Sequence, residues 1–173
     1  FDTNGTLVNA EGMKVQGWPG VNGVVNTDGQ LGDIVVPAGT MIPPTASSEV
    51  TVAGNISAVT APALPTPLTL GSTVYDAAGV GHSLSIVLTP NAGAYDVTVT
   101  DMTDPGSTAT AGSVQFLPTG AYDPGSTSAT LTTADGTVVN LDLAGVSNYG
   151  GPKSLAVTAV DGAAAGSLQQ FQI

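Results

Sequence analysis

Cysteine is absent from this 173-residue sequence, which excludes disulfide frameworks, thiolate metal sites and cysteine nucleophiles. Basic side chains are almost absent too: two Lys and Arg residues stand against 13 Asp and Glu, a formal net charge of −11. Nucleic acids and anionic membrane surfaces are bound through clustered basic groups. We therefore expect no nucleic acid and no membrane among the partners.

Long apolar runs and charged residues are scarce as well. No stretch approaches the roughly 18 apolar residues of a transmembrane helix, and charged residues make up only 9% of the chain. Hydrophobic residues reach 42%, enough for a buried core. The rest is rich in Thr, Ser, Asn and Gly, and no window has convincing helical periodicity. This composition predicts an all-β protein.

Turn sequences divide the chain into short strand candidates. In the first part, Asn4-Gly5, Glu11-Gly12 and Asp28-Gly29 predict hairpin turns. Later strands are expected at 72–76, 83–88, 94–101, 113–117, 129–133 and 137–143. Their spacing of about ten residues, with Gly- and Pro-containing turns between them, is typical of a sandwich or barrel.

A proline-rich segment, TAPALPTPLTL (60–70), interrupts this pattern with Pro62, Pro65 and Pro67. Three prolines so close together favour an extended segment and exclude a helix. We interpret it as a linker between two domains, with a loop inside one domain as the alternative.

Two acidic patterns contain residue types that could bind a cation or act as an acid–base pair. Asp2, Asn4, Gly5 and Glu11 match part of an EF-hand calcium loop, but their flanks are strand candidates, so a plain Asn-Gly hairpin is favoured. Asp101 and Asp104 could form a carboxylate pair, but Asp-Pro-Gly is ordinary turn chemistry and the few aromatics are scattered.

His82 is the single histidine, followed directly by Ser83. Neighbouring strand residues point to opposite faces, so these two cannot easily form a catalytic pair. We expect His82 at a surface position, where His82→Ala costs within about 1 kcal/mol and leaves folding largely intact. The sequence predicts no enzyme, no catalytic, cofactor-binding or metal-ligating residues, and no cofactor.

Four stretches, in order, resemble the bacterial flagellar hook protein family. NGTLVNAEGMKVQGWPG (4–20) is similar to the family's first hallmark run, with Trp18 where Tyr is usual. STVYDAAGVGHSLSIVL (72–88) resembles its VYDSxGxxHxL hairpin, matching at Val74, Tyr75, Asp76, Gly79, His82 and Leu84. YDVTVTDMTDP (95–105) and DGAAAGSLQQFQI (161–173) follow, the last with Ala163 in place of an aromatic. The stretch 115–147 matches nothing.

This resemblance implies a structural subunit outside the cell, in the hook of the flagellum. Hook subunits leave by type III export and polymerise into a curved tube, the universal joint that transmits motor torque to the filament. The implied partners are other hook subunits, hook cap and hook–filament junction proteins, and rod proteins at the base. The alternative is a cell-surface adhesin or a carbohydrate-binding β module.

The resemblance also implies two β domains, sandwich- or barrel-like, with the second inserted into the first. The inner domain would be discontinuous, 1–62 and 147–173, and the outer domain would be 63–146. Because the sequence starts at Phe1 and contains none of the family's terminal helices, we expect it to be part of a longer chain.

The isolated 173-residue chain is predicted to be a monomer at ordinary concentrations. In the resembled family the terminal helices drive polymerisation, and they are not in this sequence. Static light scattering should give the mass of one chain, 16.9 kDa, and stable tubes would contradict the prediction.

Overall fold

The computed structural model describes residues 2, 4–18, 20–21, 24–36, 41–58 and 66–167. These residues form fifteen strands with turns between them, and none of them is helical. The all-β prediction is therefore confirmed. Within these ranges, no helix is long and apolar enough to cross a membrane.

The chain divides into two compact units. Unit 1 combines Phe1–Ile42 with Gly166–Ile173, and unit 2 is the continuous segment Pro43–Ala165. The domain boundaries predicted from the sequence, at 62/63 and 146/147, differ from these. Residues 49–55 and 156–160 instead join unit 2, because their strands pair in its larger sheet. Most of the proline-rich segment, 59–65, lies outside the described residues.

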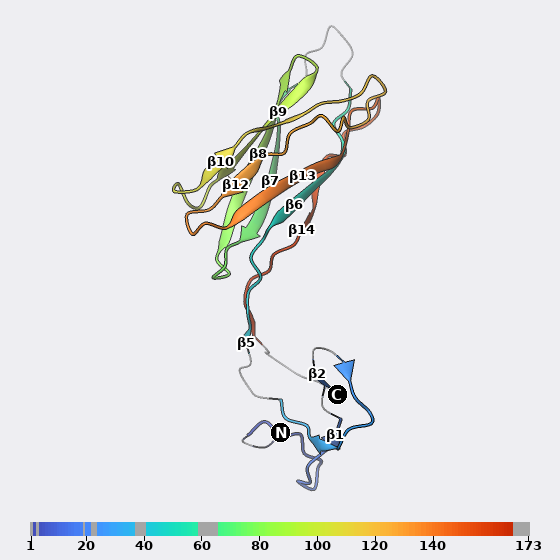
Figure 1. The fold of residues 1–173 in the computed structure, drawn as a ribbon, viewed down its shortest axis with the longest axis vertical. Helices are drawn as coiled ribbons and strands as arrows, with labels where there is room; N and C mark the ends of the chain where they lie inside the picture. The colour runs from blue at the N-terminus through green and yellow to red at the C-terminus, as the bar shows by residue number, and fades with distance from the viewer. Residues whose placement is uncertain are drawn as a thin grey trace. The chain divides into compact units, whose positions relative to one another are not determined.

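The larger sheet of unit 2 has five strands (Figure 1). Their order is β10 (Thr108–Thr110), β12 (Thr130–Thr132), β13 (Val138–Ser147), β6 (Glu49–Asn55) and β14 (Ala156–Val160). β6 and β13 run parallel, and the other neighbours are antiparallel. The parallel pair shifts register between Asp142 and Gly145, which marks a bulge in β13.

The second sheet of unit 2 has four antiparallel strands. Their order is β11 (Gly112–Val114), β9 (Ala94–Asp101), β8 (Gly81–Asn91) and β7 (Leu68–Tyr75). The β8–β9 hairpin closes through Ala92 and Gly93, both with positive φ, 47° and 91°. A two-residue turn of this kind matches the twist of the strands it joins, and the sequence had predicted a turn here.

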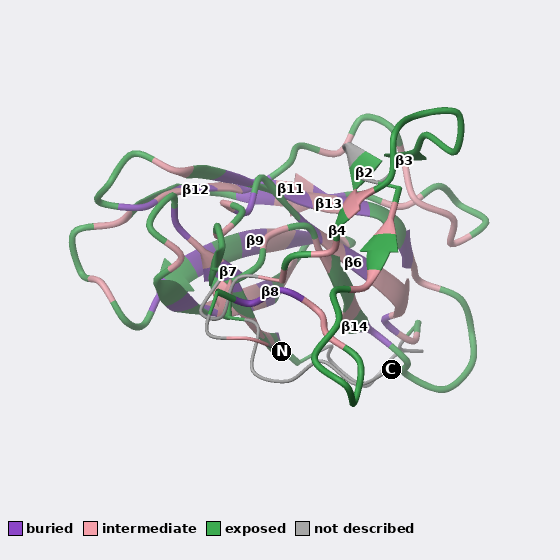
Figure 2. Cartoon of the chain, turned by 90° about the horizontal axis from the view of Figure 1, so that it is seen from below, coloured by how far each residue is buried: buried purple, intermediate pink, exposed green. Residues whose placement is uncertain are grey.

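One hydrophobic core lies between the two sheets, so unit 2 is a β-sandwich (Figures 1 and 2). Burial alternates along β8, whose buried residues are His82, Leu84, Ile86 and Leu88. This is the period-2 pattern of a strand with one face on a core. The facing sheet contributes residues such as Val50, Val52 and Leu141, all with no exposed surface.

Asn55 closes one end of the sandwich. Its amide nitrogen donates to the carbonyl oxygens of Tyr149 and Pro152, and its side-chain oxygen accepts from the Tyr149 backbone N–H at 2.8 Å. The preceding Gly54 has φ +115°, and a Cβ there would lie 2.4 Å from the Ser154 carbonyl oxygen. Only glycine fits this close approach of two backbone segments.

The described part of unit 1 consists of two-residue strands joined by turns. They are β1 (Gln16–Gly17), β2 (Gly20–Val21), β3 (Val24–Val25), β4 (Gly32–Asp33), β5 (Met41–Ile42) and β15 (Gly166–Ser167). β1 pairs with β4, β2 with β3, and β5 with β15. Among the described residues of this unit, only Gly5 and Thr6 are buried.

Most expected strands of unit 2 correspond to observed ones, with different ends. β13 continues to Ser147, beyond the expected end at 143, because β6 pairs with it along that extension. β11 ends at Val114 instead of 117, and the short edge strand β10 was not expected.

Replacing Ile86 by Ala should lower the free energy of unfolding by about 2–5 kcal/mol, because it leaves a cavity at a position with no exposed surface. Urea denaturation measures the change. Thr89→Ala, at an exposed position of the same strand, is the control and should change stability by at most about 0.5 kcal/mol. Equal effects of the two substitutions would contradict the assigned burial.

Candidate functional site

A buried histidine between two carboxylates is the most unusual polar feature of the sandwich. His82 Nδ1 lies 2.7 Å from Asp101 Oδ2, and His82 Nε2 lies 3.6 Å from Asp76 Oδ2. His82 is 6% exposed and the two aspartates are each 8% exposed. We call these three residues the Asp–His–Asp cluster.

Asp101 enters the cluster from the end of β9 and organises the turn that follows. Its Oδ1 accepts hydrogen bonds from the backbone N–H groups of Thr103 at 2.8 Å and Asp104 at 3.2 Å. Its Oδ2, besides contacting His82, accepts a hydrogen bond from the Ser107 hydroxyl at 2.8 Å. Both oxygens of the Asp101 carboxylate therefore accept hydrogen bonds, which fix the loop after β9 and orient the histidine.

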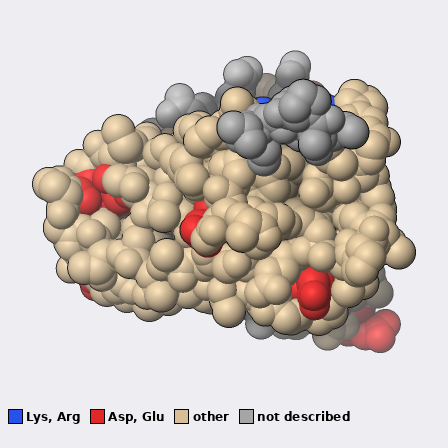
Figure 3. Space-filling model, turned by 90° about the horizontal axis from the view of Figure 1, so that it is seen from above, with Lys and Arg blue, Asp and Glu red and all other residues tan. Residues whose placement is uncertain are grey.

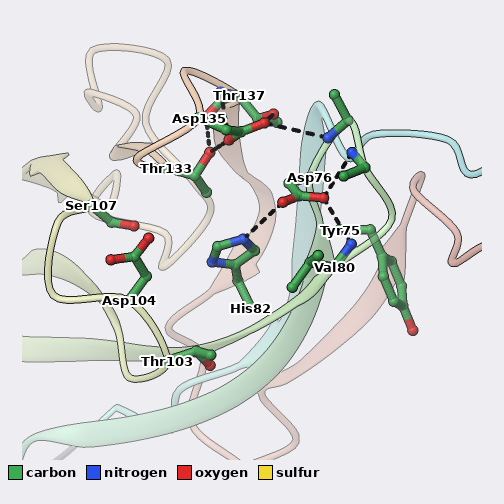
Figure 4. A network of polar contacts seen from close by, with 12 residues as sticks. Tyr75, Asp76, Val80, His82, Thr103, Asp104, Ser107, Thr133, Asp135 and Thr137 are labelled. Carbon is green, nitrogen blue, oxygen red and sulfur yellow. Dashed lines mark hydrogen bonds and ion pairs between the residues drawn. The ribbon is translucent and has the colours of Figure 1, made fainter.

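Asp76 enters from the turn between β7 and β8 (Figure 4). Its Oδ1 accepts from the backbone N–H groups of Ala78 at 2.9 Å and Val80 at 2.7 Å, while Oδ2 faces His82. The backbone N–H of Asp76 donates to the Val80 carbonyl oxygen. One carboxylate thus shapes the 76–80 turn and contacts the imidazole.

Asp135 connects this turn to a neighbouring one. Its carboxylate accepts hydrogen bonds from the hydroxyls of Thr133 and Thr137 and from the Ala77 backbone N–H (Figure 4). The two hydroxyls and the backbone N–H groups lower the pKa of Asp135 to about 2. The turn between β12 and β13 is thereby linked to the turn that carries Asp76.

The surroundings shift the pKa values of the cluster in opposite directions. Burial lowers the pKa of His82, but the contacts with Asp101 and Asp76 outweigh it and raise that pKa above its usual value. Burial raises the pKa of Asp101, but hydrogen bonds from Thr103, Ser107, His82 and Asp104 outweigh it and lower that pKa. Both shifts favour the charged pair.

The expectation that His82 occupies a surface position is wrong. The signal was available in the sequence, because His82 has the same parity as Leu84, Ile86 and Leu88 on β8 and so belongs to the inward face. His82 and Ser83 point to opposite faces of the strand as expected, but it is Ser83 that is exposed. What the sequence did not indicate is that Asp76 and Asp101 converge on the imidazole.

The geometry of the cluster differs from that of a nucleophilic catalytic triad. The Ser107 hydroxyl, which shares Asp101 Oδ2 with the imidazole, donates to that carboxylate. The imidazole nitrogens face carboxylates on both sides, and His82 Nε2 is a buried atom with no hydrogen-bond partner within normal distance. A triad instead needs a nucleophile hydrogen-bonded to one of these nitrogens.

The other candidate residues hold turns. Asp2 Oδ1 accepts from the backbone N–H groups of Asn4 and Thr6. Within the described ranges, no three His, Asp or Glu side chains are grouped so as to hold a metal ion. Asp104 Oδ1 accepts from the Gly106 backbone N–H at 2.8 Å, which is the turn chemistry expected for Asp-Pro-Gly.

Comparison of the sequence with models of protein families gives no match, and comparison with curated proteins gives none either.

Replacing His82 by Ala should lower the free energy of unfolding by about 3 kcal/mol or more, because it leaves two buried carboxylates facing a cavity without their counter-charge. Urea denaturation at pH 6 measures the loss. Ser83→Ala, at the exposed neighbour, is the control and should have little effect. A loss under 1 kcal/mol for His82→Ala would contradict the role of the cluster.

The cluster should make stability depend on pH. Because the folded pKa of His82 is raised, its contribution is complete below about pH 6.5 and is lost as pH rises through the folded pKa. Because the folded pKa of Asp101 is lowered, its contribution is complete above about pH 3.9 and is lost as pH falls through the folded pKa. Urea denaturation across pH 3–9 measures both limbs.

His82→Gln is the matched variant for the upper limb, since glutamine does not titrate. The difference in unfolding free energy between the original protein and the variant should shrink as pH rises above 6.5. A difference that is constant from pH 5 to 9 would contradict the assigned direction of the shift.

Proposed function

We propose that this chain is a structural subunit of the bacterial flagellar hook, part of the curved tube that passes torque from motor to filament. The proposal rests on the ordered match of four stretches to the hook family, and above all on the stretch 72–88. It includes the partners that go with that role: other hook subunits, the hook cap and junction proteins, and the rod.

The observation that carries the proposal is the position of the matched residues in the β7–β8 hairpin. Val74, Asp76, His82 and Leu84 are all buried, and two of them belong to the Asp–His–Asp cluster. These matched residues therefore contribute to the buried core and to the polar contacts that stabilise the fold. This fits a subunit whose task is to keep its shape under load, and it requires no reaction.

The surface also supports a structural role. On the face that Figure 3 shows, acidic side chains form small separate groups in a surface that is otherwise largely uncharged. Contacts between such surfaces depend little on ion pairs of fixed geometry. They would tolerate the small relative displacements that neighbouring subunits make as a curved tube rotates.

The alternative, an adhesin or carbohydrate-binding module, has less support. Sugar-binding faces usually present a row of exposed aromatic rings. In the described part of the chain the exposed aromatic side chains are Trp18 and Tyr149, one in each unit. Tyr95 and Phe116 pack edge-on against each other at a centroid distance of 6.2 Å, with Tyr95 in the core.

Immunogold electron microscopy tests the proposal. An antibody raised against the 173-residue chain should label the short curved segment between basal body and filament in flagella from cells that encode it. Cells in which the gene is deleted are the control and should lose both the label and the hook. Label on the filament alone, or on non-flagellar cell surface, would overturn the proposal, and binding of the chain to a glycan array would favour the alternative.

A further inference from the structure

The chain enters and leaves unit 2 through two segments that pair with each other. We call residues 43–48 and 161–165 together the stem. Thr45 and Ala163 exchange two backbone hydrogen bonds of 2.9 Å each. Asp161 Oδ1 accepts from the backbone N–H groups of Ser48 and Glu49. Hydrogen bonds therefore hold the two segments of the stem together at the base of the sandwich.

The turn that carries Asp76 is packed directly on the stem. Ser47 is 1% exposed; its backbone N–H donates to the Tyr75 carbonyl oxygen, and its hydroxyl accepts from the Tyr75 backbone N–H. Gly79 approaches the stem so closely that a Cβ there would lie 2.6 Å from Pro44 Cβ and 3.3 Å from the Ala165 nitrogen. A change in the backbone conformation of the 76–80 turn would therefore alter its contacts with the stem.

The shape of that turn depends in part on Asp76, which also faces His82. A doubly protonated imidazole presents an N–H to each carboxylate of the cluster. A neutral imidazole carries only one N–H, so one ring nitrogen then turns a lone pair toward a buried carboxylate. The two contacts that the ring makes can both be favourable only while it is charged.

The other charges around the ring share one sign. Asp104, from the loop after β9, and Asp135, from the β12–β13 turn, lie near the cluster (Figure 4). Among the ion pairs of the described residues, Lys14 pairs with Asp33 in unit 1, and no lysine joins the cluster. The imidazolium is therefore the counter-charge available to this group of carboxylates.

We propose that the His82 imidazolium is a pH-sensitive latch: its contacts with Asp101 and Asp76 hold the 76–80 turn against the stem, and loss of its proton loosens that turn. The path runs from the ring to Asp76, from Asp76 to the backbone of the turn, and from the turn to Pro44, Ser47 and Ala165. The inference concerns unit 2 alone and does not depend on the flagellar proposal.

Proton NMR tests the latch without any substitution. His82 is the single histidine, so its imidazole Cε1–H resonance reports its titration without ambiguity. We expect a midpoint above pH 6.5, and the backbone amide signals of Ser47, Gly79 and Ala163 should shift with the same midpoint. The amide of Gly93, in the turn beyond the far end of β8, is the internal control and should not follow it. A midpoint at or below 6.5, or stem amides that stay constant while His82 titrates, would overturn the proposal.

Asp76→Asn isolates the charge from the shape of the turn. The asparagine Oδ1 can still accept from Ala78 and Val80, but the side chain no longer carries the negative charge that favours the imidazolium. The His82 midpoint should fall by about one pH unit or more. Asp123→Asn is the matched control, since Asp123 holds a similar turn through the Gly125 N–H in the hairpin beyond β11, and it should leave the midpoint unchanged. Equal midpoints in Asp76→Asn and the original protein would also overturn the latch.

Discussion

The pairing of β6 between β13 and β14 is the constraint on which unit 2 depends. β6 runs parallel to β13 and antiparallel to β14, so it pairs with two strands that both lie far from it along the chain. Val50 and Val52, which point from β6 into the core, have no exposed surface. The same strand sets the position of the stem, because Ser48 and Glu49 at its start are held by Asp161 just after β14. Without β6 the sandwich would have neither a closed core nor a defined base.

The Asp–His–Asp cluster adds a second kind of order to this frame. Burying charges costs free energy, and attraction between them compensates only when every polar atom has a partner. Here Asp101 is saturated by its loop and the imidazole, whereas the contact of His82 Nε2 with Asp76 is long. The cluster is therefore rigid on the Asp101 side and adjustable on the Asp76 side. The adjustable side is the one packed on the stem.

The sequence predicts the parts of this fold that neighbours along the chain determine. The sequence predicts the β7–β8 and β8–β9 hairpins from alternating strands separated by Gly-containing turns. In the structure Ala92 and Gly93 supply the positive φ angles that the tight β8–β9 turn needs. The parallel β6–β13 pair was not predicted, because no local pattern identifies a partner so distant in the sequence. His82 illustrates what a local pattern can and cannot predict. Its place in the alternation along β8 indicates burial, but its contact with Asp101 depends on the register between β8 and β9. The observed domain boundaries differ from the predicted ones for the same reason, since β6 and β14 join unit 2 only through long-range pairing.

The parallel pairing also has a kinetic consequence. Glu49 and Asn140 are partners across β6 and β13 although they are 91 residues apart (140 − 49). Closing so long a loop costs chain entropy before any contact compensates it, and β-sandwiches rich in such pairs fold in milliseconds to seconds. During synthesis, β6 emerges well before β13 and β14 and has no partner in its sheet until they follow. Its apolar residues lack their sheet neighbours for that interval, so the five-stranded sheet can be completed only after β13 and β14 have left the ribosome.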